Sequence, residues 1–186
     1  YGFPNYCVLS YPILDIPDIQ EFDKVLCIAP SIQDGMNPST NCDSKWSLDK
    51  EIQNHFEQKK YLISSLEKVK VGGICIYSTH SLNPFENEAV INSVLKMPQF
   101  EGKLELIDYS SFMKEIKRKN GLTQWNLDVC KKIKDPELLE SLSSDSLIEN
   151  IDRCMRFYPH QIHSTGTFIA VIRKLDEFEK KFTKSI

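Results

Sequence analysis

The sequence is poor in glycine, has no closely paired cysteines and contains no long apolar run. With 7 glycines in 186 residues, it carries neither a Walker motif nor a dinucleotide-binding glycine motif. Its 6 cysteines never form C-x-x-C, and three lie in apolar runs where thiols pack as small hydrophobic groups. This indicates an intracellular protein, nuclear or cytoplasmic rather than secreted. No apolar stretch reaches the ~18 residues of a membrane span, so we expect no membrane contact.

An excess of positive charge is also missing. The chain has 23 Lys and Arg against 26 Asp and Glu, a net charge of −3, so any nucleic-acid contact must be local. The composition, 41% hydrophobic and 26% charged, is that of a globular domain with one core. Because the chain begins at Tyr1 directly with a strand-like segment, we interpret it as the back part of a longer polypeptide.

Hydrophobic periodicity predicts strands alternating with helices, the pattern of an α/β sheet. The expected strands cover 6–9, 24–29, 74–78, 103–109 and 167–172. Two expected helices begin at the cap residues Ser47 and Asn83, and two shorter ones cover 110–119 and 147–156. The turn-forming segment 33–43 follows the carboxyl end of a strand, where open α/β sheets bind their ligands.

Four blocks together carry a family signature. Residues 77–90 read Y-S-T-H-S-L-N-P-F-E-N-E-A-V, and residues 23–35 read D-K-V-L-C-I-A-P-S-I-Q-D-G. Residues 122–125 read L-T-Q-W, and residues 153–171 open with R-C-M-R and close with T-G-T-F-I-A-V. In this order, over about residues 5 to 175, the chain resembles the Nol/Nop/Sun-domain RNA (cytosine-5) methyltransferases, and L-T-Q-W is similar to their tRNA-modifying branch.

The resemblance implies a Rossmann-like fold of the class I S-adenosylmethionine-dependent methyltransferases. That sheet has seven strands in the order 3-2-1-4-5-7-6, with the last-numbered strand antiparallel. On this fold the chain supplies the third strand onward and lacks the first two. Residues 1–175 are then the C-terminal part of the catalytic domain, and residues 176–186 form a charged tail.

The family's chemistry requires a cysteine thiolate. Carbon 5 of a pyrimidine is too weak a nucleophile to accept a methyl group until a thiolate adds at carbon 6. In the family this thiol stands in T-C-S, and a second one, in D-x-P-C, helps to release the enzyme. His80 occupies the first position here and Ser31 the second, so the resemblance implies that neither catalytic residue is intact. His80 is then a turn residue, a replacement nucleophile or a metal ligand.

The cofactor positions differ from the family as well. The family's two acids at S-adenosylmethionine align with Pro12 and Ile28, which offer no side-chain acceptor, and its glycine-rich loop has no counterpart here. We therefore expect no cofactor for this chain, although the family uses S-adenosylmethionine. His160 and His163 lack further ligands at metal spacing, so we expect no metal.

A basic stretch gives the clearest hypothesis about binding. Seven cations lie on either side of Trp125 in the sequence: Lys114, Lys117, Arg118, Lys119, Lys131, Lys132 and Lys134. Positive charge beside an aromatic ring suits single-stranded or loop RNA. The alternative is an ordinary solvated face.

Three hypotheses follow from these residues. The first is a catalytically inactive methyltransferase-like domain that binds RNA, such as tRNA, or a protein partner. The second is an active RNA (cytosine-5) methyltransferase, in a longer form, that uses a non-standard catalytic residue. In the third, the strand around Val25 lacks its usual neighbours and leaves a bare sheet edge, through which the chain associates with itself.

Overall fold

The computed structural model describes residues 8, 10–12, 16, 21–36, 47–131, 133–134 and 136–178. Six strands form one sheet: β1 (Phe22–Ile28), β2 (Val69–Thr79), β3 (Leu104–Leu106), β4 (Lys119–Asn120), β5 (Met155–Phe157) and β6 (Thr167–Lys174). The α-helices are α1 (Leu48–Glu67), α2 (Glu88–Leu95), α3 (Pro136–Leu142) and α4 (Pro159–Ile162). Single 3-10 turns are η3 (Pro84–Glu86), η4 (Ser110–Met113), η5 (Asp128–Cys130) and η6 (Ile151–Arg153).

The strand order confirms the fold class that the resemblance implies. The order is β1-β2-β6-β5-β4, and β3 pairs with β6 as well. β1 is parallel to β2, whereas β6 is antiparallel to β2 and to its partners β3 and β5. The series β1-β2-β6-β3 therefore reproduces the expected 4-5-7-6 part of the methyltransferase order. The predicted strand 6–9 lies outside the described residues.

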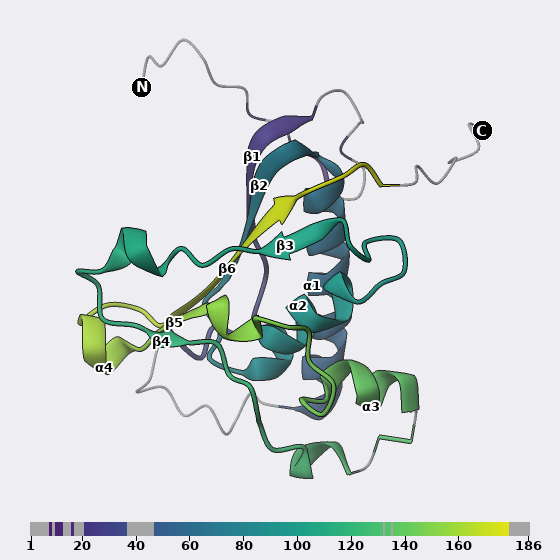
Figure 1. Cartoon of the computed structure of the whole chain (residues 1–186). Coiled ribbons are helices and arrows are strands. Elements are labelled where there is room, and N and C mark those ends of the chain that lie inside the picture. Colours follow the sequence, from purple (N-terminus) through teal and green to yellow (C-terminus); the bar gives the residue numbers. More distant parts are fainter. Residues whose placement is uncertain are drawn as a thin grey trace.

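The core lies between the sheet and the two longest helices, which cover the same face (Figure 1). α1 begins where the Ser47 side chain accepts a hydrogen bond from the Lys50 N–H, with Asp49 and Glu51 in its first turn. Leu62 and Leu66 of this helix are fully buried, and each such side chain contributes about 1.5–3 kcal/mol by leaving water.

The opposite face of the sheet is covered unevenly. Around Met155, Phe157 and Val171 it carries a second apolar cluster. At β1, where alternate side chains point to opposite faces, Cys27 enters the core but Leu26 and Ile28 remain 61% and 65% exposed. Within the described residues β2 is the sole strand neighbour of β1, so β1 forms an edge of the sheet.

Two predicted helices are wrong. The segment 110–119 forms only the turn η4 before it extends into β4, and 147–156 forms the turn η6 followed by β5. In both places backbone pairing overrides local helical preference, because β4 pairs with β5 and β5 pairs with β6. The helix from Asn83 is interrupted, with η3 and α2 meeting at Asn87. Of the expected tail, Phe178 packs on Phe100 at 4.7 Å between ring centroids, and residues after 178 lie outside the described part.

Candidate functional site

The segment 31–36, which follows β1, crosses the carboxyl end of β2. The N–H of Gly35 donates to the carbonyl of His80 at 2.9 Å, and the N–H of Gly166 donates to the carbonyl of Gly35 at 2.7 Å. A Cβ atom on Gly35 would lie 2.7 Å from both the His80 and the Gly166 carbonyl oxygens. Only glycine permits this approach, which brings three of the four signature blocks together at one end of the sheet.

His80 sits at this junction in a half-buried position. Its Nδ1 lies 3.4 Å from the carbonyl oxygen of Gly166 and 3.4 Å from Oγ1 of Thr167. Both contacts are at the long end of hydrogen-bonding distance, so they orient the ring only weakly. Ser31, the other family position, is half-buried at the start of the crossing segment.

Two acidic side chains hold the crossing segment in place. Oδ1 of Asp34 accepts the N–H of Leu82 at 2.8 Å. Glu86 is fully buried and accepts from Nδ2 of Asn54 at 2.6 Å and from the N–H of Ile32 at 3.2 Å. Burial raises the pKa of Glu86, and its hydrogen bonds from Ser81, Asn54 and Ile32 act against that rise. The acid of the N-P-F-E block therefore anchors a loop.

No cysteine within the described residues supplies a thiolate to this end of the sheet. Cys27, Cys75, Cys130 and Cys154 are free thiols with at most 3% of their surface exposed. Burial raises the pKa of each of them, so they remain protonated and unreactive at neutral pH. Cys7 and Cys42 lie outside the described residues.

The two positions that the resemblance assigns to the family's cofactor-binding acids carry no carboxylate. Ile28 ends β1 with an aliphatic side chain, and Pro12 has no side-chain acceptor. In the described part of the chain no group of three or more His, Cys, Asp or Glu side chains could hold a metal ion. No described helix is long and apolar enough to cross a membrane.

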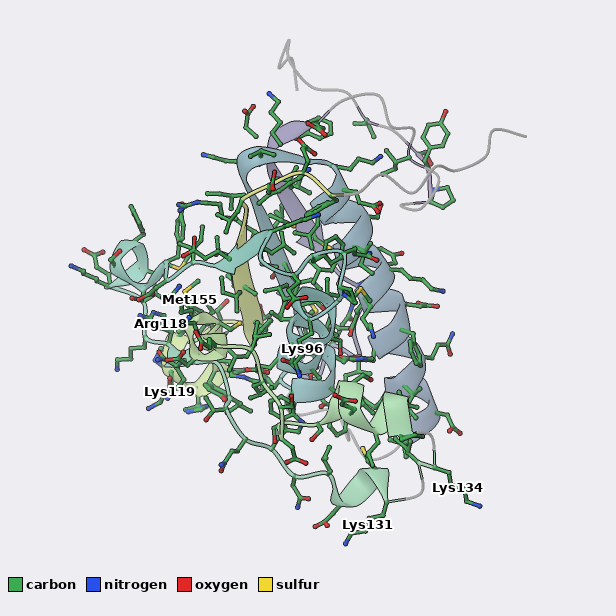
Figure 2. All side chains as sticks on the ribbon, turned by 45° about the vertical axis from the view of Figure 1, so that its right-hand side comes forward. Lys96, Arg118, Lys119, Lys131, Lys134 and Met155 are labelled. Atoms are coloured by element: carbon green, nitrogen blue, oxygen red, sulfur yellow. The ribbon has the colours of Figure 1, made fainter. Side chains whose placement is uncertain are left out.

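The predicted basic patch is divided in space (Figure 2). Lys114, Lys117 and Arg118 lie between η4 and β4, and Lys119 is the first residue of β4. Lys131 and Lys134 follow η5 and lie at the lower right of Figure 2, far from Arg118 and Lys119 at the left. Lys132 falls outside the described residues. The indole N–H of Trp125 donates to the carbonyl of Leu142 at 2.7 Å, and its ring packs with Phe85 and Leu142. Trp125 therefore belongs to a small core.

A buried ion pair was not expected from the sequence. Arg156 of β5 and Glu88 of α2 are 1% and 0% exposed, and Nε of Arg156 donates to Oε1 of Glu88 at 2.6 Å. The Leu122 N–H donates to the same carboxylate, and Nη1 of Arg156 donates to the Leu82 carbonyl. Burial alone would lower the pKa of Arg156, but Glu88 outweighs it and raises that pKa. The pair thus connects three signature blocks. In the sequence, the feature that could have indicated a buried ion pair is an arginine between the apolar residues of a strand.

Comparisons with known proteins agree with this arrangement. Residues 6–173 match the family described as 16S rRNA methyltransferase RsmB/F. The chain is 33% identical over 94% of its length to the multisite-specific tRNA:(cytosine-C(5))-methyltransferase trm4b of Schizosaccharomyces pombe, and 33% identical over 87% to the tRNA (cytosine(34)-C(5))-methyltransferase of Drosophila melanogaster. It covers only 28% and 24% of those two proteins.

A solved structure of a methyltransferase homolog is also similar to this chain. The crystal structure of a methyltransferase homolog protein from Pyrococcus horikoshii superimposes with a TM-score of 0.59 at 30% identity, over 84% of this chain and 40% of the other. Family match, relatives and fold agree with the signature blocks that meet at the end of the sheet. The chain therefore belongs to the RsmB/F family of methyltransferases, the Nol/Nop/Sun-domain family that its sequence resembles.

Proposed function

We propose that this chain binds RNA on a methyltransferase fold without methylating it. The single observation that carries the proposal is the pair of residues at the strand ends. Ser31 and His80 stand where the family reaction needs thiols, and the described cysteines are buried with raised pKa values. A serine hydroxyl is a weak nucleophile unless a base within hydrogen-bonding distance takes its proton.

The RNA part of the proposal is supported by the relatives and by local charge. The two relatives compared above are named as methyltransferases of tRNA, and this chain spans about a quarter of each. Four of its own cations lie within the short segment that runs from the end of η4 to the first residue of β4. Asp34 and Glu86 still hold the crossing segment in place, although the two family positions for thiols carry Ser31 and His80. This combination supports a domain that keeps the family fold without its catalytic chemistry.

The test offers the 186-residue chain S-adenosylmethionine with a labelled methyl group, together with total tRNA. We expect no heat of cofactor binding in calorimetry and no label in the RNA. We also expect RNA binding that weakens steeply between about 50 and 200 mM salt. The double variant Ser31→Cys/His80→Cys restores both thiols and should remain inactive, because Ile28 and Pro12 are unchanged.

Two results would contradict the proposal. Methyl transfer by the unaltered chain, abolished in His80→Ala, would establish the alternative of a non-standard nucleophile. Absence of RNA binding even at about 50 mM salt would remove the RNA part. A thiol-bearing relative from the same family serves as the positive control for both assays.

A further inference from the structure

An aromatic ring projects into solvent on the segment between β3 and β4. Phe112 in η4 is 78% exposed, although large apolar side chains normally avoid water. Its ring stacks on Tyr109 with 4.9 Å between centroids and 29° between planes. Figure 1 shows the η4 turn standing away from the body of the sheet. One partner and high exposure leave much of the Phe112 ring available for a second stacking contact.

The same segment concentrates positive charge. Between Tyr109 and Asn120 there are four cations, Lys114, Lys117, Arg118 and Lys119, against the single acid Glu115. The three lysines are exposed and Arg118 is half-exposed. This charge contrasts with the net −3 of the whole chain, so a polyanion would be attracted to this place.

The base of the segment is firmly held. Oδ1 of Asp108 accepts the N–H of Ser110 at 2.8 Å, and Tyr109 and Met113 pack against the cluster around Met155. A small polar hollow opens between the two ends of the segment, lined by Asp108, Ser110, Arg118, Asn120, Asp152 and Arg153. Such a hollow offers both hydrogen-bond donors and acceptors, as a ribose 2′-hydroxyl requires.

The sheet register connects this segment with the His80 site. Lys119 pairs with Arg156, and Arg156 pairs with Phe168. Phe168 in turn pairs with Thr79, the residue before His80. Three strand spacings of about 4.8 Å place Lys119 roughly 14 Å across the sheet from Thr79. A strand of nucleic acid held at the segment would thus lie within a few nucleotides of the old catalytic position.

We propose that residues 109–119 form a docking surface for single-stranded RNA, in which Phe112 stacks on an unpaired base while Lys114, Lys117, Arg118 and Lys119 contact phosphates. The surface rests on the RNA-binding part of the proposed function and gives it a location and a preferred form of RNA. A duplex hides its bases inside the helix, so an exposed stacking ring favours single strands or loops.

The test measures fluorescence anisotropy of a short labelled single-stranded RNA with the 186-residue chain. Phe112→Ala should weaken binding roughly five- to a hundred-fold without altering the salt dependence, because it removes stacking and no charge. Phe112→Tyr should retain the affinity. Lys117→Ala/Lys119→Ala should lower the slope of log affinity against log salt by about 1.4, near 0.7 for each phosphate that the variant no longer neutralises. The charge-matched control Lys131→Ala/Lys134→Ala should leave that slope unchanged.

The outcomes separate this surface from the proposed function. If the unaltered chain binds RNA and Phe112→Ala binds equally well, the surface is wrong and the proposed function stands. If the chain prefers a duplex of the same sequence over the single strand, the stacking mode is wrong. If the chain binds no RNA at low salt, the proposed function itself fails. Urea unfolding of each variant checks the fold, which exposed substitutions should leave within about ±0.5 kcal/mol, or roughly a twofold change in the unfolding constant.

Discussion

His55 is a histidine that folding keeps neutral. Its side chain is fully buried in α1, and Nδ1 donates to the carbonyl of Phe85 at 2.8 Å. Burial lowers the pKa of His55 to about 4, with the charge of Lys59 acting in the same direction and the hydrogen bond to Phe85 against it. The ring thus helps to connect α1 with η3, beneath the segment that crosses the strand ends.

The pKa of His55 predicts a pH dependence of stability. The unfolded ring titrates near 6.5, so protonation favours the unfolded chain, and the stability present above about pH 6.5 is lost as the pH falls towards 4. We expect this ring to account for about 3 kcal/mol of the loss in the free energy of unfolding over that interval. Urea unfolding at a series of pH values measures this loss. His55→Gln should remove the contribution of the ring to the slope of unfolding free energy against pH.

The control for that measurement is His160→Gln, which alters an exposed ring and should keep the slope of the unaltered chain. Because carboxyl groups that titrate in the same range contribute equally to every variant, their contribution cancels when the slopes of unfolding free energy against pH are compared. Glu86, whose raised pKa favours the folded state at low pH, is among them. Equal slopes for His55→Gln and the unaltered chain would contradict the assignment.

At the scale of elements, the crossing segment 31–36 depends on the absence of a side chain at Gly35. Gly35→Ala places a Cβ 2.7 Å from two carbonyl oxygens, so the segment must lift and its hydrogen bonds to His80 and Gly166 must lengthen. We expect a loss of about 1–3 kcal/mol in unfolding free energy and faster hydrogen exchange at the Gly35 and Gly166 amides.

Gly72→Ala provides a contrast, because nothing lies within 4 Å of its Cβ and its positive φ of 81° alone causes strain. That variant should lose about 1–2 kcal/mol and leave exchange at Gly35 and Gly166 unchanged. Unaltered exchange at those two amides in Gly35→Ala would show that the crossing segment is not held as the structure indicates.

The elements differ in how far the sequence alone could predict them. β1, β2, β6 and α1 were found because each is a sustained apolar pattern with a clear cap or turn beside it. β4 and β5 were missed because strands of two or three residues show no hydrophobic period. Their extended conformation comes from pairing, of β4 with β5 and of β5 with β6. α3 also lay in a stretch without a clear pattern.

Residues of the candidate site could be predicted where a signature block could be aligned with the family. They could not be predicted where tertiary contacts decide which side chain is buried. Ser31 and His80 were identified by their places in the signature, and the structure brings their segments together. Trp125 was proposed as a stacking ring; its indole is half-buried and packs against a small core, whereas Phe112 is 78% exposed. Burial of one aromatic side chain rather than another depends on tertiary packing, which spacing along the chain does not reveal.

At the scale of the whole molecule, β1 is an edge of the sheet within the described part of the chain, and its outer face is apolar. Leu26 and Ile28 are 61% and 65% exposed, and an unpaired strand edge is a template for a second strand. We expect self-association that increases with concentration in sedimentation equilibrium, and Leu26→Lys should shift the chain towards monomer. Leu175→Lys, which charges an exposed leucine beyond β6, is the matched control. Monomer at every concentration would contradict pairing through this edge.

The position of β6 has a consequence for how the protein is made. This strand comes last among the described elements, yet it lies inside the sheet, with β2 on one side and β3 and β5 on the other. During translation those three strands therefore remain unpaired with β6 until Thr167–Lys174 has emerged from the ribosome. Chains dominated by such distant pairings fold slowly, and their waiting strands are exposed to aggregation. A nascent chain arrested before Thr167 should accordingly depend on chaperones far more than the finished protein does.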